Sequence, residues 1–374
     1  MRAPTVGDIA DFMDRWAPPH LAEDWDRVGL QLGSRDQPVG RVLLAVDLSS
    51  AVVEEALARA ADLIVCHHPA IFRPVASLTD SSAQGRKLLS LARAGVSVFV
   101  AHTNLDAAHA HSTSDALARA IGLFADVNPL VPPAQPPTLK LVTYVPPTSA
   151  DTVFAALAEA GAGCIGQYSH CSYRVTGHGT FLPGPGTHPA VGEVGRLETT
   201  DETRLETIVP PGALERVLSA LHSAHPYEEP AYDVFPLHTS ASPARFARRG
   251  TLREPMSMGD LCRAAASALG AERVGLVGDP TRRVTCVAVC AGSGGSLVDP
   301  MASMGFEAMI TGELGHHDAL SALDHELSVI MMGHHTTERP ILDVARERLI
   351  GSFGEGLEAT VADGDGDPLR GCAA

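Results

Sequence analysis

The stretch IVCHHPAIFRP, residues 64–74, decides how the first part of the chain folds. It starts as a short apolar run typical of a buried strand, and it continues into two adjacent histidines, His67 and His68, and then Pro69. Neighbouring strand side chains point to opposite faces, so two histidines share one site most easily where the strand has ended. Pro69 favours an extended His68 and cannot donate a ladder hydrogen bond. Ligands of parallel α/β sheets bind at this edge, so the pair is placed for metal binding, although a hydrogen-bonded strand end explains the motif equally well.

Strands and helices alternate around this stretch. The pattern predicts strands at residues 41–49, 62–69 and 96–106, and helices at residues 50–61 and 85–95. Strands that alternate with helices imply a parallel sheet with both faces covered. We therefore expect an α/β lobe in the first part of the chain.

The last third of the chain repeats this plan. Apolar strands are predicted within residues 282–296, 306–320 and 326–342, and the second and third of them end in histidines and carboxylates, as in the first lobe. We interpret the fold class as α/β, with two related three-layer lobes that form one core. The lobes are predicted at residues 1–127 and 246–374.

The segment between the lobes has a different pattern. A proline-rich linker at residues 129–138 precedes it, and residues 240–250 lead back to the second lobe. Its predicted elements follow the order β-α-β-β-α-β, which is the ferredoxin-like pattern. We expect residues 128–245 to form a ferredoxin-like α+β domain inserted into the core.

The composition excludes several classes of protein. The 374 residues are 45% hydrophobic and 19% charged, which indicates a globular chain. No apolar run reaches ~18 residues, and the first residues lack the apolar core of a signal peptide, so we expect a cytoplasmic protein without a membrane partner. The net charge of −16 disfavours duplex nucleic acid. Seven cysteines without CxxC spacing argue against a disulfide framework and a thiolate zinc site, and Cys66 is expected in the core.

Other strand ends strengthen the interpretation of His67 and His68 as metal ligands. Residues 102–109 supply His102 and Asp106, and residues 333–340 supply His334 and Glu338. If a helix begins at His334, this histidine and Glu338 share a face at i, i+4, and His335 points away. Imidazoles and carboxylates without a thiolate suit zinc, manganese or iron, and they can hold two ions that activate a water molecule.

Several motifs support only weaker predictions. His316 and His317 follow a strand of the second lobe, and one of them could face the site as a proton shuttle. The run AGSGGS at residues 291–296 could offer N–H groups to a phosphate, but a tight turn is favoured because the Lys-Ser/Thr of a P-loop is missing. HPYEEP at residues 225–230 is expected to be structural, and the DGDGD tail is expected to fray.

Five sequence blocks together resemble one family, the NGG-interacting-factor-three-like family, whose members carry the description GTP cyclohydrolase I type 2 homolog. The blocks are WDRVGLQLG (25–33), CHHPAIF (66–72), HTNLDAA (102–108), ITGELGHHDAL (310–320) and GHHTTERP (333–340). HPYEEPAYDVFPL (225–237) resembles the inserted domain of its long bacterial members, which is similar to copper-tolerance and nitrogen-regulator folds. The resemblance implies a toroidal homohexamer with two divalent metal ions per subunit, zinc before manganese or iron. It assigns the metal ligands as His67, His68, Asp106, His334 and Glu338.

Two functions follow from this resemblance and from the ligand types. The first is a metal-dependent hydrolase that acts on a small anionic or nucleotide-like substrate, with His102 and His316 as candidate catalytic residues. His102 could equally orient Asp106 or have a structural role. The sequence has only 5% aromatic residues and no obvious cluster that would recognise a purine. The alternative is a metal-binding or regulatory scaffold without catalytic activity.

Overall fold

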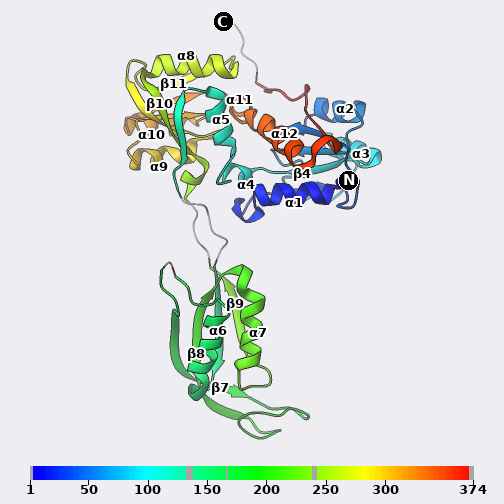
Figure 1. Cartoon of the computed structure of the whole chain (residues 1–374), viewed down its shortest axis with the longest axis vertical. Coiled ribbons are helices and arrows are strands. Elements are labelled where there is room, and N and C mark those ends of the chain that lie inside the picture. Colours follow the sequence, from blue (N-terminus) through cyan, green and yellow to red (C-terminus); the bar gives the residue numbers. More distant parts are fainter. Residues whose placement is uncertain (1–2, 132–137, 166, 238–241, 370–374) are drawn as a thin grey trace. The chain divides into compact units, whose positions relative to one another are not determined.

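The chain forms two compact units around three sheets (Figure 1). The computed structural model describes residues 3–131, 138–165, 167–237 and 242–369. One unit, here called the core unit, comprises Met1–Ala134 and Ala241–Ala374. The other, the inserted unit, comprises Gln135–Ser240.

The first sheet of the core unit has the order β1–β4–β3–β2–β15. Strands β4, β3, β2 and β15 run parallel, and β1 pairs antiparallel with β4. The strands are β1 (Gly29–Leu32), β2 (Arg41–Ala45), β3 (Leu63–Cys66), β4 (Ser97–Val100) and β15 (Glu358–Val361).

Both faces of this sheet are buried under helices. Alternate strand residues such as Leu44 and Val65 belong to a core cluster with α1 (Val6–Trp16) and α12 (Pro340–Phe353). Leu43, Ile64 and Cys66 belong to the cluster on the other face, which includes residues of α2 (Ser50–Ala58) and α3 (Ala83–Ala94). This alternation is the period of two that a strand imposes on its side chains, and it places Cys66 in the core as expected.

The second sheet of the core unit has the order β11–β14–β13–β12–β10–β5. Only β12, β13 and β14 run parallel within it. Core clusters pack α5 and α8 against one face and α9 and α10 against the other. The strands are β5 (Phe124–Pro129), β10 (Arg248–Ser257), β11 (Gly275–Val277), β12 (Arg283–Val289), β13 (Ala308–Thr311) and β14 (Ser328–Met331). The helices are α5 (Thr113–Ile121), α8 (Met258–Leu269), α9 (Val298–Ser303) and α10 (His316–Asp324).

The two sheets differ from the prediction in two respects. They are mixed, with parallel centres and antiparallel strands at their edges. They also do not follow the predicted lobe boundaries, because β15 from the last part of the chain completes the first sheet, and β5 from the first part completes the second. Neither exchange could be read from local sequence, since an edge strand has the same pattern whichever sheet it joins.

Two short helices continue from the carboxyl ends of parallel strands. The expected strand at residues 96–106 ends at Val100, and α4 (Thr103–Asp106) follows it. After β14, Gly333 leads with a φ of 91° into α11 (His334–Glu338). The predicted helical start at His334 is therefore confirmed.

Within its described residues, the inserted unit has one antiparallel sheet and two α-helices. Its elements follow the order β-α-β-β-α-β, and the sheet order is β7–β8–β6–β9. They are β6 (Leu139–Val145), α6 (Ala150–Glu159), β7 (Ser172–Phe181), β8 (Glu198–Val209), α7 (Leu214–Ala224) and β9 (Tyr232–Pro236). His225 of the HPYEEP motif is buried, and both its ring nitrogens have backbone partners, at Tyr144 O and Tyr227 N. This histidine is structural.

The expectation of a frayed tail is wrong for the residues that the structure describes. Gly364 N–H donates to the Glu55 carboxylate, and Asp365 accepts hydrogen bonds from the backbone N–H groups of Val46 and Asp47. The tail is ordered because Asp365 accepts from backbone donors that follow β2, and because the Glu55 carboxylate of α2 accepts from the tail backbone. Residues 132–137 of the predicted linker and residues 370–374 lie outside the described residues. Among the described residues, every helix is too short or too polar to traverse a lipid bilayer.

Candidate metal centre

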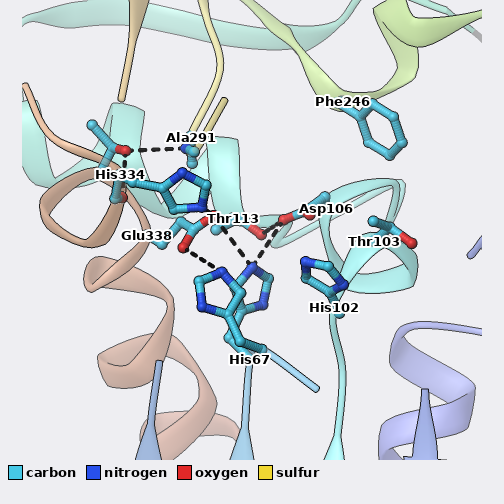
Figure 2. A network of polar contacts seen from close by, with 12 residues as sticks. His67, His102, Thr103, Asp106, Thr113, Phe246, Ala291, His334 and Glu338 are labelled. Atoms are coloured by element: carbon cyan, nitrogen blue, oxygen red, sulfur yellow. Dashed lines mark hydrogen bonds and ion pairs between the residues drawn. The ribbon is translucent and has the colours of Figure 1, made fainter. Parts of the chain in front are cut away.

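The buried carboxylate of Glu338 is the centre of a cluster of histidines. Its Oε1 lies 3.1 Å from His334 Nε2 and 3.6 Å from His67 Nε2, and its Oε2 lies 3.1 Å from His68 Nε2. Asp106 Oδ1 lies 3.5 Å from His67 Nε2 and accepts a hydrogen bond from Thr113. Figure 2 shows these side chains pointing toward one another from both halves of the core unit. The five residues that the resemblance assigns as ligands therefore come together.

Every histidine of the cluster is tethered through Nδ1. The acceptors are Ala101 O for His67 (2.8 Å), Asp47 for His68 (2.9 Å), Asp26 for His102 (2.8 Å) and Glu313 for His334 (3.0 Å). Carbonyl and carboxylate oxygens only accept hydrogen bonds, so Nδ1 carries the proton in each of these pairs. Nε2 of the neutral ring then carries a free lone pair that can bind a metal ion. This is the tautomer and the orientation that metal-bound histidines require.

Two buried polar atoms of the cluster have no hydrogen-bond partner. They are His67 Nε2 and Glu338 Oε2. A buried polar atom without a partner costs roughly 1–3 kcal/mol, and a bound cation would satisfy both atoms at once. The donor set and these two atoms therefore fit divalent metal ions.

The donor atoms form two groups that could each hold an ion. His67, His68 and His102 form one group, and His68, His334 and Glu338 form the other, with the donor atoms of each group within 4.8 Å of one another. His102 thus lies closer to the ligands than the sequence suggested. Its ring centroid is 5.3 Å from that of His67 and 5.4 Å from that of His68.

Protonated imidazoles can balance the negative charge of Glu338. Burial opposes protonation of His68, but the hydrogen bond to Asp47 and the nearby carboxylate of Glu338 outweigh it and raise its pKa to about 10. The hydrogen bond to Glu338 raises the pKa of His334 to about 9, although burial opposes this shift. Burial favours the neutral form of Glu338, but the surrounding imidazoles hold its pKa well below the usual value. A buried carboxylate needs a positive neighbour, which either protons or metal ions supply here.

The glycine-rich run at residues 291–296 packs directly against the cluster. Gly292 has a φ of +69°, and a Cβ on it would lie 2.4 Å from Glu338 Oε1. A Cβ on Gly312 would lie 2.5 Å from Gly292 O and 2.7 Å from Thr337 Oγ1. These glycines allow the loops after β12 and β13 to approach α11 closely. That role agrees with the tight turn favoured above.

The C-terminal tail contacts residues that hold the candidate ligands. Asp365, whose side chain is 1% exposed, accepts from Val46 N (2.9 Å) and Asp47 N (3.2 Å), and Asp47 in turn holds His68. His335 Nε2 lies 3.3 Å from Asp365 Oδ2, so His335 points away from Glu338 as expected. Asp365 therefore connects the neighbours of two candidate ligands.

Sequence reasoning missed the carboxylates that orient the histidines. Asp47 and Glu313 directly follow the parallel strands β2 and β13, so the argument that found His67 would have found them as well. Asp26 had no such signal, because it reaches His102 and Thr103 from a loop distant in sequence. Burial opposes its ionisation, but the bonds to His102 and Thr103 lower its pKa to about 2.

His316 is placed differently from the other candidates. It is exposed at the start of α10, and its ring contacts the ring of His317 at 5.5 Å. Among the described residues it has no hydrogen bond or ion pair with the five candidate ligands, and its predicted catalytic role remains a prediction.

Comparisons with known proteins identify the family of the chain. The family model Duf34/NIF3 (NGG1p interacting factor 3) matches residues 4–368. A Mycobacterium tuberculosis protein described as "GTP cyclohydrolase 1 type 2 homolog" is 38% identical over 366 residues, which cover 97% of this chain and 96% of that protein. A Halalkalibacterium halodurans protein with the same description is 35% identical over 91% of both chains.

Solved structures give the same result. A Bacillus cereus protein related to NIF3 superposes with a TM-score of 0.67 and 31% identity over 100% of both chains. A Staphylococcus aureus protein superposes with a TM-score of 0.71 and 24% identity, also over 100% of both chains, and it supports the fold. These matches extend over nearly the whole chain, and they show that it belongs to the Duf34/NIF3 family.

Proposed function

We propose that the protein is a divalent-metal-dependent hydrolase that acts on a phosphoester or nucleotide. The observation that carries the proposal is the set of three tethered histidines, His67, His68 and His334, whose Nε2 atoms lie within 3.6 Å of the Glu338 carboxylate. The proposal also agrees with the buried Nε2 of His67 and the buried Oε2 of Glu338, which have no hydrogen-bond partner in the protein and which a bound cation would satisfy.

His67, His68, Asp106, His334 and Glu338 would hold two divalent ions, zinc in the first place and manganese or iron as alternatives. Glu338 would be the central ligand residue, since three imidazole Nε2 atoms lie within 3.6 Å of its oxygens. When bound, the ions supply an activated water molecule and stabilise negative charge on the reacting group. The surrounding carboxylates hold each imidazole in the orientation that this chemistry needs.

His102 is the residue to which we assign proton transfer. Asp26 accepts a hydrogen bond from Nδ1–H and so fixes the ring, and His102 lies in one cluster with His67 and His68. The variant His102→Gln tests this role against a ligand role. Retention of both ions with slower turnover would support proton transfer, whereas loss of one ion would make His102 a ligand.

The substrate class rests on the metal centre and on the relatives. Bound divalent ions would be the largest local charges of the site, so they could coordinate an anionic group directly despite the net charge of −16. The description "GTP cyclohydrolase 1 type 2 homolog" of the relatives is consistent with a nucleotide. His316 could serve as a further proton carrier only if it approaches the site in another state.

The decisive experiment measures metal content and turnover together. Protein loaded with zinc, manganese or iron is assayed on a panel of phosphoesters and nucleotides, beside His68→Ala and the control His178→Ala. His178 forms the same kind of Nδ1–carboxylate pair, with Asp201 at 2.8 Å, but it is exposed in the inserted unit. We expect His68→Ala to lose metal and activity and His178→Ala to keep both. Activity that survives His68→Ala would refute the proposal, and inactivity on the whole panel would favour the non-catalytic scaffold.

Three structural proposals accompany the function. The two lobes of the core unit would be related three-layer α/β lobes, since each has parallel central strands whose ends carry ligands. The inserted unit would be a ferredoxin-like domain, as its β-α-β-β-α-β order suggests. The subunits would assemble as a homohexamer, which light scattering of the purified protein can test.

A further inference from the structure

We propose that Trp25 and Phe72 form a stacking site for a planar heteroaromatic ring beside the metal centre, so that the molecule bound there carries both a ring and an anionic group. Nothing in the relatives' descriptions assigns such a site to these two residues. The proposal rests on the proposed function in one respect, because the metal centre is taken to hold the anionic end of the same molecule.

The two rings form an exposed pair. Trp25 is 54% exposed and Phe72 is 46% exposed, and their ring centroids lie 5.9 Å apart at an interplanar angle of 57°. Aromatic side chains offer large apolar faces for stacking, and these two lie next to each other and open to solvent. This pair could not be predicted from local sequence, because the two residues lie far apart along the chain.

The pair lies at the edge of the histidine cluster. The Trp25 ring is 6.1 Å from the ring of His102, and His102 is 5.3 Å from His67. Phe72 follows the His67–His68 pair in the loop between β3 and α3. A ring stacked on Trp25 or Phe72 could therefore keep a covalently attached phosphate or other anion within reach of the candidate ligands.

The loops that carry the pair are held in place by polar contacts. Asp26, next to Trp25, accepts from His102, Thr103 and its neighbour Arg27. The Gln31 side chain then connects the two loops, since its Nε2 donates to Arg27 O (2.8 Å) and its Oε1 accepts from Ile71 N (2.7 Å). A preorganised pair of rings binds with less loss of conformational entropy than a mobile one. The motif WDRVGLQLG thus supplies a ring, a histidine tether and a connection between loops.

The test uses the intrinsic fluorescence of the zinc-loaded full chain. The protein has two tryptophans, and Trp16 is 8% exposed, so a bound ring should change mainly the emission of Trp25. The probes are GMP, CMP and ribose 5-phosphate, and calorimetry measures each affinity. The variants are Trp25→Leu and Phe72→Leu, with Phe235→Leu as a control, because Phe235 is 51% exposed in the inserted unit.

We expect GMP or CMP to quench the emission of the native protein and to bind more tightly than ribose 5-phosphate. Trp25→Leu and Phe72→Leu should each weaken nucleotide binding by roughly 5- to 150-fold and leave ribose 5-phosphate binding unchanged. The control Phe235→Leu should bind all three probes like the native protein. Equal affinities for all three probes would overturn the proposal. So would Trp25→Leu if it dissociated the assembly without weakening nucleotide binding, since a second copy of the chain would then cover the pair.

Metal content and turnover, measured on the same samples, separate this proposal from the proposed function. Nucleotide binding that depends on Trp25 without any hydrolysis would support the stacking site and count against the hydrolase. Hydrolysis that is indifferent to Trp25→Leu and Phe72→Leu would support the hydrolase and refute the stacking site.

Discussion

Replacing Asp365 by alanine should weaken both the fold and the metal centre, although the residue contacts no candidate ligand. The substitution leaves the backbone N–H groups of Val46 and Asp47 without their acceptor. An unsatisfied buried donor costs about 1–3 kcal/mol, so two of them should lower the free energy of unfolding by about 2–6 kcal/mol. At roughly 2 °C per kcal/mol for a unit of this size, the Tm should fall by about 4–12 °C.

The same substitution should also lower the affinity for metal, because it disturbs His68. Asp47 orients the His68 imidazole, and its backbone is fixed by Asp365. Loss of the outer partners of a metal ligand typically lowers metal affinity roughly 10–100-fold. Calorimetric titration of metal-free protein with zinc measures this change, and a thermal scan of the same sample measures the Tm.

The same tail provides a matched control, Asp363→Ala. Asp363 is also an aspartate, but its side chain is 87% exposed and pairs with the partly exposed Arg59. An exposed pair of this kind contributes about 0–1 kcal/mol, so the control should keep its Tm and its zinc affinity nearly unchanged. If Asp365→Ala and Asp363→Ala behave alike in both assays, the supporting role of the tail is refuted. Asp365→Asn, which retains one acceptor oxygen, should fall between native protein and Asp365→Ala.

Three further predictions concern the cluster itself. The pKa values of His68 and His334 are raised to about 10 and about 9, so zinc binding at pH 7 should release protons and should strengthen as the pH rises toward 9. For the same reason the metal-free protein should lose stability between roughly pH 6.5 and 10. Calorimetry in buffers of different ionisation enthalpy checks the proton release, and thermal scans check the stability. Gly292→Ala should lower zinc affinity more than Gly305→Ala, since both glycines have positive φ but only the first would place a Cβ against Glu338. Asp26→Asn should keep the metal content and slow turnover roughly 10–100-fold, because the amide can donate to His102 and favour the wrong tautomer; unchanged turnover would contradict the role of this pair.

Much of the candidate site could be predicted from sequence because its residues follow a local rule. His67, His68 and His334 come directly after apolar strands, and the carboxyl ends of parallel strands meet at one edge. The i, i+4 spacing of His334 and Glu338 placed both on one face of a helix, which the 3.1 Å contact between them confirms. Periodicity and strand-end chemistry were sufficient for these positions.

Other features depend on contacts between distant residues and had no local signal. The Asp26 carboxylate looks like any loop aspartate in the sequence, and its burial against Thr103 exists only in the folded chain. The Asp365 carboxylate was taken for part of a frayed tail, because an Asp-Gly run has low structural propensity by itself. The Trp25–Phe72 pair was missed for the same reason, since composition does not reveal which aromatic residues stay exposed.

The pairing of β15 with β2 has a consequence for co-translational folding of the protein. Residues Arg41–Ala45 emerge early, whereas their parallel neighbour Glu358–Val361 is translated only after everything between Ala45 and Glu358. At a translation rate of about 5–20 residues per second, β2 waits roughly 15–60 s with an open, apolar edge. A nascent chain should therefore recruit a chaperone to this edge, and metal capture should come last, when the late histidine and glutamate finally reach the early ones.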